Sequence, residues 1–150
     1  MTPVARNRMT ILLADDDPDD RLLVGDALAA GGVLNDLHTV SDGEELMNYL
    51  HRRGAYDVEG AAPRPALILL DLSMPKKDGL RALAEIKADP ALRQIPIVVM
   101  TTSNQDEDIG RSYDLGASSF VTKPITFKAL VSVMKTIGEY WFEVVELPES

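Results

Sequence analysis

The sequence contains no cysteine among its 150 residues. This absence excludes disulfide bonds, thiol nucleophiles and thiolate metal ligands, and it leaves oxygen ligands for any bound metal. No apolar run is long enough to span a bilayer. The N-terminal MTPVARNRMT leads into a short ILLA run and then into acids, whereas a secretory leader needs a longer apolar stretch and a small-residue cleavage site. We therefore expect a cytoplasmic protein that does not associate with membranes.

Basic residues are also scarce relative to acidic ones. Fifteen Lys and Arg stand against 24 Asp and Glu, which gives a net charge of −9 and a pI near 4.6. Nucleic-acid binding depends on clustered Lys and Arg that neutralise phosphates, so we expect no nucleic-acid partner. The remaining composition, 45% hydrophobic and 26% charged, is ordinary for a globular protein. A chain of this length is long enough to bury the core of one domain.

Short apolar runs alternate with longer helical patterns along the chain. The predicted strands cover residues 10–14, 36–41, 66–70, 95–102 and 118–123. The predicted helices run from Pro18 to the Gly31-Gly32 pair, over 44–53, 79–88 and 105–115, and from an N-cap at Thr126 to about 143. Strands that alternate with helices of this length predict an α/β domain, with a parallel sheet covered by helices on both faces.

The first predicted helix carries clear signals at both ends. Asp17 is suited to the N-cap, with Pro18 at the first helical position, and the Gly31-Gly32 pair ends the helix. The apolar residues expected on its buried face are Leu22, Leu23, Ala27 and Leu28.

Polar side chains stand where the predicted strands end, which is where ligands bind in open parallel sheets. If the first and third strands are neighbours, Asp15, Asp16 and Asp71 converge there. Such carboxylates repel one another unless some are protonated or a cation lies between them, and oxygen ligands favour Mg²⁺. A Lys123 ammonium and a Thr101 hydroxyl would suit a phosphoryl group. The set fits phosphoryl transfer to a carboxylate.

Four segments, ILLADDDPDD, LILLDLSMPKKDG, IPIVVMTTS and GASSFVTKP, resemble in order and spacing the receiver domains of two-component signalling. The resemblance covers residues 10 to 138, approximately. It implies a flavodoxin-like, doubly wound (βα)5 fold with a five-stranded parallel sheet in the order 2-1-3-4-5. We expect residues 1–9 to be a flexible tail and residues 10–150 to form the receiver domain. We expect this domain to include a helical extension over about 139–150 and no output domain after it.

The same resemblance implies roles for the acidic residues. Asp71 is the phosphoacceptor, and the receiver acts as a switch rather than as an enzyme. Asp16 binds Mg²⁺ directly, Asp15 acts through a metal-bound water, and the backbone carbonyl of Ser73 is a further protein ligand.

By the resemblance, Lys123 and Thr101 act on the phosphoryl group, and Thr101 and Phe120 form the switch. Lys123 pairs with the phosphoryl oxygens, Thr101 moves its hydroxyl onto them, and Phe120 turns inward as Thr101 moves. The resemblance also implies a cis peptide between Lys123 and Pro124.

The expected partner is a sensor histidine kinase. The loop over residues 54–65 and the C-terminal IGEYWFEVVELP are similar to regulators paired with phytochrome-type kinases. Tyr140, Trp141 and Phe142 are three of the chain's eight aromatic residues, and an apolar surface of this kind usually marks an interface. We expect a homodimer through the last helix and its extension; the alternative is that this segment folds back onto its own domain.

Several alternatives stay open at this point. Asp15, Asp16 and Asp17 taken alone would be a helix-capping acidic loop. A phosphatase that forms an aspartyl-phosphate usually has a second acid two residues after its nucleophile, where this chain has Ser73. A phosphorylation-independent interaction module or a phosphate sink could use the same fold, and flavin binding is a more distant possibility.

Overall fold

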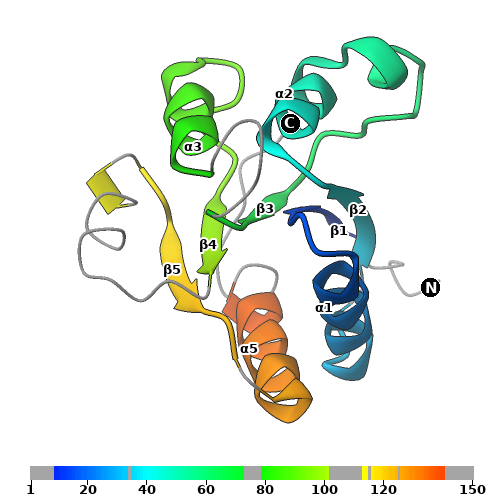
Figure 1. Cartoon of the computed structure of the whole chain (residues 1–150), viewed down its shortest axis with the longest axis vertical. Helices are drawn as coiled ribbons and strands as arrows, with labels where there is room; N and C mark the ends of the chain where they lie inside the picture. Colours follow the sequence, from blue (N-terminus) through cyan, green and yellow to red (C-terminus); the bar gives the residue numbers. More distant parts are fainter. Residues whose placement is uncertain are drawn as a thin grey trace, which may run out of the picture.

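The computed structural model describes residues 9–33, 35–72, 79–101, 113–114, 116–124 and 126–140. Within them, a five-stranded sheet forms the middle layer (Figure 1). Its strands are β1 (Met9–Ala14), β2 (Asn35–Val40), β3 (Leu67–Leu70), β4 (Ile97–Thr101) and β5 (Ser119–Thr122). All pairs are parallel, and the order in space is β2-β1-β3-β4-β5. The predicted α/β fold and strand order are confirmed.

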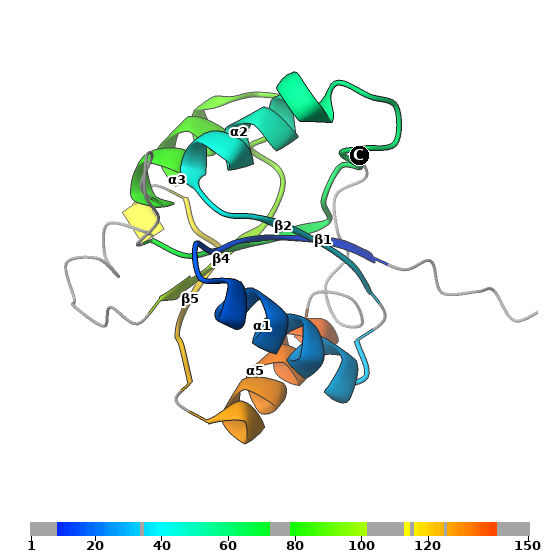
Figure 2. The ribbon, with the colours of Figure 1, turned by 45° about the vertical axis from the view of Figure 1, so that its right-hand side comes forward.

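Helices cover both faces of this sheet, as Figure 2 shows. The pair α1 (Pro18–Ala30) and α5 (Phe127–Glu139) lies on one face, and the pair α2 (Gly43–His51) and α3 (Gly79–Ala88) lies on the other. A 3-10 turn, η1 (Gly54–Tyr56), follows α2. None of the helices in the described ranges is long and apolar enough to cross a membrane. Residues 1–8 of the predicted tail, most of the predicted helix over 105–115, and residues 141–150 lie outside the described residues. The predicted tail is wrong at Met9, which is the first residue of β1.

The central strands are apolar on both sides because both faces of the sheet are covered. In β1, Leu12 and Ala14 join the core beneath α2 and α3, while Ile11 and Leu13 join the core against α1 and α5. All four residues of β3 are buried. Fully burying a side chain of this size contributes about 1.5–3 kcal/mol. The residues that follow β1 and β3 are therefore attached to strands whose side chains are buried on both faces of the sheet.

The end signals of α1 are confirmed, but part of its predicted buried face is wrong. The Asp17 carboxylate accepts a hydrogen bond from the Asp19 amide at 2.9 Å, and the helix ends at the Gly31 cap. The buried residues are Val24, Ala27 and Leu28, whereas Leu22 is 65% exposed and Leu23 is 42% exposed. Successive helical residues turn by about 100°, so Leu22 stands roughly 200° from Val24.

The chain after β5 also differs from expectation at one point. The described residues contain no cis peptide bond, so the expected cis geometry at Lys123–Pro124 is wrong. The helix start that follows is as predicted, because the Thr126 hydroxyl accepts a hydrogen bond from the Ala129 amide at 3.1 Å.

Candidate phosphoryl and metal site

The backbone of β1 and β3 places two carboxylates side by side. Ala14 pairs with Leu70 in the parallel register, so Asp15 and Asp71 are the next residues on neighbouring strands. The Asp71 amide donates to the Ala14 carbonyl at 2.9 Å, and the Asp15 amide donates to the Val40 carbonyl at 3.0 Å. These backbone hydrogen bonds between neighbouring strands fix the main chain of both residues, so the two side chains start from adjacent positions.

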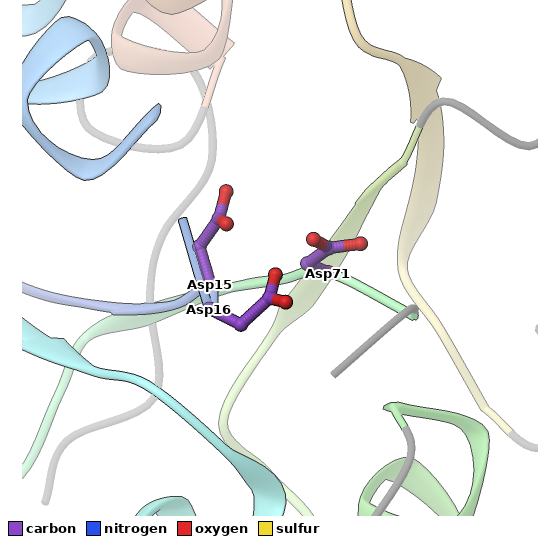
Figure 3. A group of neighbouring side chains, drawn as sticks. All are labelled: Asp15, Asp16 and Asp71. Carbon is purple, nitrogen blue, oxygen red and sulfur yellow. The ribbon is translucent and has the colours of Figure 1, made fainter. Parts of the chain in front are cut away.

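Asp16 completes a group of three acids. Asp15, Asp16 and Asp71 each offer a carboxylate oxygen, and these oxygens all lie within 4.8 Å of one another. Figure 3 shows Asp15 and Asp16 leaving the end of β1 and Asp71 leaving the end of β3. Asp15 and Asp71 are buried, whereas Asp16 is exposed. Three oxygen donors of this kind, one of them open to solvent, fit a hard divalent cation that keeps some of its water.

The turn that carries Asp15 is fixed by local hydrogen bonds. One Asp15 carboxylate oxygen accepts from the Asp17 amide at 3.0 Å. The Asp15 carbonyl accepts a hydrogen bond at 2.7 Å from the guanidinium of Arg21, which lies about one turn into α1. The acidic loop does cap the helix, through Asp17, but the same backbone holds Asp15 facing the neighbouring strand.

Lys123 brings a cation to these acids from the other end of the sequence. It directly follows β5, and its Nζ lies 2.8 Å from Asp15 Oδ2, 2.8 Å from Asp20 Oδ2 and 3.2 Å from Asp71 Oδ2. The Lys123 side chain is only 15% exposed. Lys123, Asp15 and Asp71, three of the predicted site residues, are therefore in direct contact.

Burial and charge set the protonation of this pair. Burial raises the pKa of Asp15, and the nearby Asp71 charge adds to it, while hydrogen bonds from Lys123 and the Asp17 amide offset part of the rise. Burial alone would lower the pKa of Lys123, but hydrogen bonds to Asp15 and Asp20 and the charge of Asp71 outweigh it, so this pKa is raised. Lys123 is therefore a permanent cation at neutral pH, and it partly compensates the crowded acids.

The remaining predicted residues are only partly described. Thr101 is the last residue of β4 and pairs in register with Thr122, next to Lys123. Phe120 is partly buried against the core beneath α2 and α3, and its amide donates to the Tyr113 hydroxyl at 3.2 Å. Ser73 lies outside the described residues.

Asp20 also belongs to this cluster of described residues, and the sequence analysis did not single it out. It belongs to the first turn of α1, three positions after the Asp17 cap. Helical side chains lean toward the N-terminus of their helix, which here faces the end of the sheet. An acid at this position could have been included on that ground, but its partner, Lys123, lies 103 residues away.

The fold and this polar cluster together define a class of protein. The model of the response regulator receiver domain family matches residues 11–135, and the chain belongs to this family. It is accordingly a response regulator rather than a conventional enzyme.

Its similarities are more specific than the family. Response regulator Rcp1 from Synechocystis sp. is 41% identical over 138 residues, which cover 92% of this chain and 92% of that protein. The crystal structure of the phosphorylated cyanobacterial phytochrome response regulator RcpA matches with a TM-score of 0.87 and 44% identity, over 95% of this chain and 99% of that one. The Mn²⁺-bound form of Rcp1 matches with a TM-score of 0.85 and 40% identity, over 94% and 99%. This receiver is thus close to phytochrome-associated regulators.

Proposed function

We propose that this protein is a phosphorylation-dependent switch that accepts a phosphoryl group on Asp71 from a histidine kinase. The observation that carries the proposal is the Lys123 ammonium, 3.2 Å from Asp71 Oδ2 at the rim of the three-acid group. A cation already held at the acceptor oxygen is what a phosphoryl group needs as its negative charge arrives. The phosphorylated and Mn²⁺-bound relatives support this assignment.

The transfer is a displacement at phosphorus. An Asp71 carboxylate oxygen forms a bond to phosphorus as the bond from phosphorus to the kinase histidine nitrogen breaks, and that nitrogen keeps the electron pair. The product is an acyl phosphate with about −1.5 to −2 charges at neutral pH. Lys123 holds the phosphoryl oxygens, because its Nζ already lies 3.2 Å from Asp71 Oδ2.

Mg²⁺ is the cofactor we assign to this site. Asp16 and Asp71 would hold it directly, Asp15 would act through a metal-bound water, and the Ser73 backbone carbonyl would add a ligand. The ion would neutralise negative charge on the transferring group. The three-acid group suits it, because its donors are oxygens and one of them is exposed.

The switch would connect Asp71 to the surface through Thr101 and Phe120. Thr101 ends β4 beside Thr122, and Phe120 is only partly buried against the core, so an inward turn of its ring would bury more apolar surface. To convert a mostly inactive population into a mostly active one, phosphorylation must favour the active state by roughly 5 kcal/mol.

The partner we propose is a histidine kinase of the phytochrome type, because RcpA, which is 44% identical to this chain, is a phytochrome response regulator.

A homodimer through α5 and the segment after it also belongs to the proposal. Phe127 and Tyr140, at the two ends of α5, are both large and exposed. Sedimentation of the parent beside a Phe127→Asp, Tyr140→Asp double variant tests the dimer, and equal masses would reject this surface.

The function itself is tested with acetyl phosphate, with and without Mg²⁺, by intact mass. We expect one added phosphoryl group on the parent, only with Mg²⁺, and none on Asp71→Asn. Label that persists on Asp71→Asn would mean that another residue is the acceptor. Absence of label on the parent, together with no Mg²⁺-dependent binding of beryllium fluoride, would favour a phosphorylation-independent interaction module.

A further inference from the structure

The Lys123 ammonium has a carboxylate partner that the proposed chemistry does not use. Asp20 Oδ2 lies 2.8 Å from Lys123 Nζ, as near as Asp15 Oδ2 and nearer than Asp71 Oδ2 at 3.2 Å. An ammonium has three hydrogen-bond donors, and these three acids occupy all of them. Asp20 is therefore part of the arrangement that fixes where the charge of Lys123 points.

Asp20 differs from the other two partners in its relation to the metal group. Asp15 and Asp71 belong to the three acids whose oxygens lie within 4.8 Å of one another, and Asp20 does not. Its side chain is 36% exposed, against 1% for Asp15. A cation held by the three-acid group would compete with Lys123 for Asp15 and Asp71, but it would leave Asp20 as a partner of the ammonium.

The start of α1 also fixes the position of the Asp20 backbone. It is in the first turn of α1, where the Asp17 cap and Pro18 fix the helix start. An acid in this turn is favoured by the helix dipole. Lys123, in contrast, reaches the site on a flexible four-carbon stem from the end of an edge strand. Without a fixed partner, that stem would have to give up more rotamer freedom when the phosphoryl group arrives.

We propose that Asp20 is a positioning residue for phosphoryl transfer: it holds the Lys123 ammonium beside Asp71 when a cation engages Asp15 and Asp71. The inference rests on the proposed function, because it assigns the means by which Lys123 is kept ready for the phosphoryl oxygens. The charge of Asp20 also has an opposite effect, because it repels an anionic phosphodonor. The two effects change the rate in opposite directions.

The experiment compares Asp20→Asn with Asp19→Asn in the full chain. Asp19 is one position earlier on the same helical turn, is exposed, and is not among the three acids that contact Lys123 within the described residues. Both variants remove one negative charge from the helix start. Phosphoprotein formation from acetyl phosphate at saturating Mg²⁺ is followed by intact mass, and Mg²⁺ affinity is measured separately by titration.

We expect Asp20→Asn to slow labelling about fivefold, which corresponds to about 1 kcal/mol. Asp19→Asn should stay within about twofold of the parent, and Mg²⁺ affinity of Asp20→Asn should change little because Asp20 is outside the metal group. Asp20→Glu keeps a carboxylate within reach and should recover part of the rate. If Asp20 had only a structural role, the labelling rate and the urea unfolding midpoint of Asp20→Glu would recover together. A positioning role predicts that the labelling rate recovers while the unfolding midpoint stays unchanged.

A double-mutant cycle tests whether the effect passes through Lys123. In a Lys123→Ala background, Asp20→Asn should cause no further slowing. Asp20→Asn that labels faster than the parent, or no slower than Asp19→Asn, overturns the inference, and so does equal slowing with and without Lys123. If the Lys123→Ala background takes no label, the comparison with Asp19→Asn and Asp20→Glu decides. A parent that takes no label refutes the proposed function itself, which is a distinct result.

Discussion

The Lys123 ammonium and the Asp15 carboxylate lie 2.8 Å apart, although 108 positions separate them in the sequence. One residue follows the edge strand β5 and the other follows β1. Asp15 is almost completely buried, so its charge depends on this partner for compensation. Removing one partner of such a buried ion pair destabilises the fold, because the other charge is then buried without compensation.

Replacing Lys123 by Met should therefore destabilise the metal-free protein by about 3 kcal/mol. The variant leaves the Asp15 and Asp71 carboxylates buried without their cation. Mg²⁺ should restore part of the loss because it supplies positive charge to the same acids. Urea unfolding in EDTA and in Mg²⁺ measures both effects. Lys128→Met, which removes an exposed lysine from α5, is the control, and an equal loss in both variants would contradict the assignment.

Asp16 should matter for metal binding and little for the stability of the metal-free fold. It is exposed and is not one of the three carboxylates that contact Lys123. Mg²⁺ at one hundred times its Kd should stabilise the parent by about 2.7 kcal/mol. Asp16→Asn should lose most of this gain, whereas Asp57→Asn, which removes an exposed acid after η1, should keep it. Thermal unfolding with increasing Mg²⁺ gives the comparison; parallel curves for all three proteins would reject a metal role for Asp16.

Gly79 permits a close backbone approach beside Asp71, the proposed phosphoacceptor. Its amide donates to the Leu72 carbonyl at 3.0 Å, and a Cβ at this position would lie 2.5 Å from Leu72 Cα and nearer still to the Asp71 carbonyl. Gly79→Ala should shift the Asp71 backbone, lower the unfolding free energy by about 1–3 kcal/mol and slow labelling of Asp71.

Gly25→Ala is the matched control for this variant. It lies within α1, and an added Cβ would meet only the end of the Leu37 side chain at 3.3 Å. Alanine in a helix interior is favoured over glycine by about 1 kcal/mol, so this variant should be at least as stable as the parent. Chemical unfolding and the labelling assay distinguish the two; normal labelling of Gly79→Ala would show that the backbone at Asp71 tolerates the shift.

Tyr49 should make stability fall at alkaline pH. Burial raises the pKa of Tyr49 from 10 to about 12, with Arg52 opposing the rise, and the hydroxyl donates to the Pro63 carbonyl at 2.8 Å. Because the folded-state pKa is the higher one, this contribution is fully present below about pH 10 and is lost as the pH rises towards 12. Two pKa units correspond to at most about 2–3 kcal/mol.

Urea unfolding at pH 8, 10 and 11 tests this dependence. Tyr49→Phe should be less stable than the parent by about 1 kcal/mol at pH 8, because the Pro63 carbonyl loses its donor. Its further loss at pH 11 should be smaller than that of the parent, whereas Tyr140→Phe, at an exposed tyrosine, should follow the parent. Identical slopes for the parent and Tyr49→Phe would show that Tyr49 does not titrate with unfolding.

The sheet and the placement of Asp15 and Asp71 could be predicted because they depend on local patterns. Short apolar runs that end in acids mark buried parallel strands, and the parallel register then places those acids together. Leu22 and Leu23 were predicted wrongly because a mixed apolar segment does not show which stripe meets the sheet. Asp20 was missed because its importance comes from Lys123, and a contact across 103 residues leaves no local signal.

The loop between η1 and β3 has a practical consequence. It enters β3 at the N-terminal end, whereas Asp71 follows the C-terminal end, so about 13 Å of strand separates the two. Val58 in this loop is 66% exposed, and the chain has no native cysteine. A Val58→Cys variant would thus carry one fluorescent dye at a defined place. Such a labelled protein could report the binding of a partner in real time while the Asp71 carboxylate stays unobstructed.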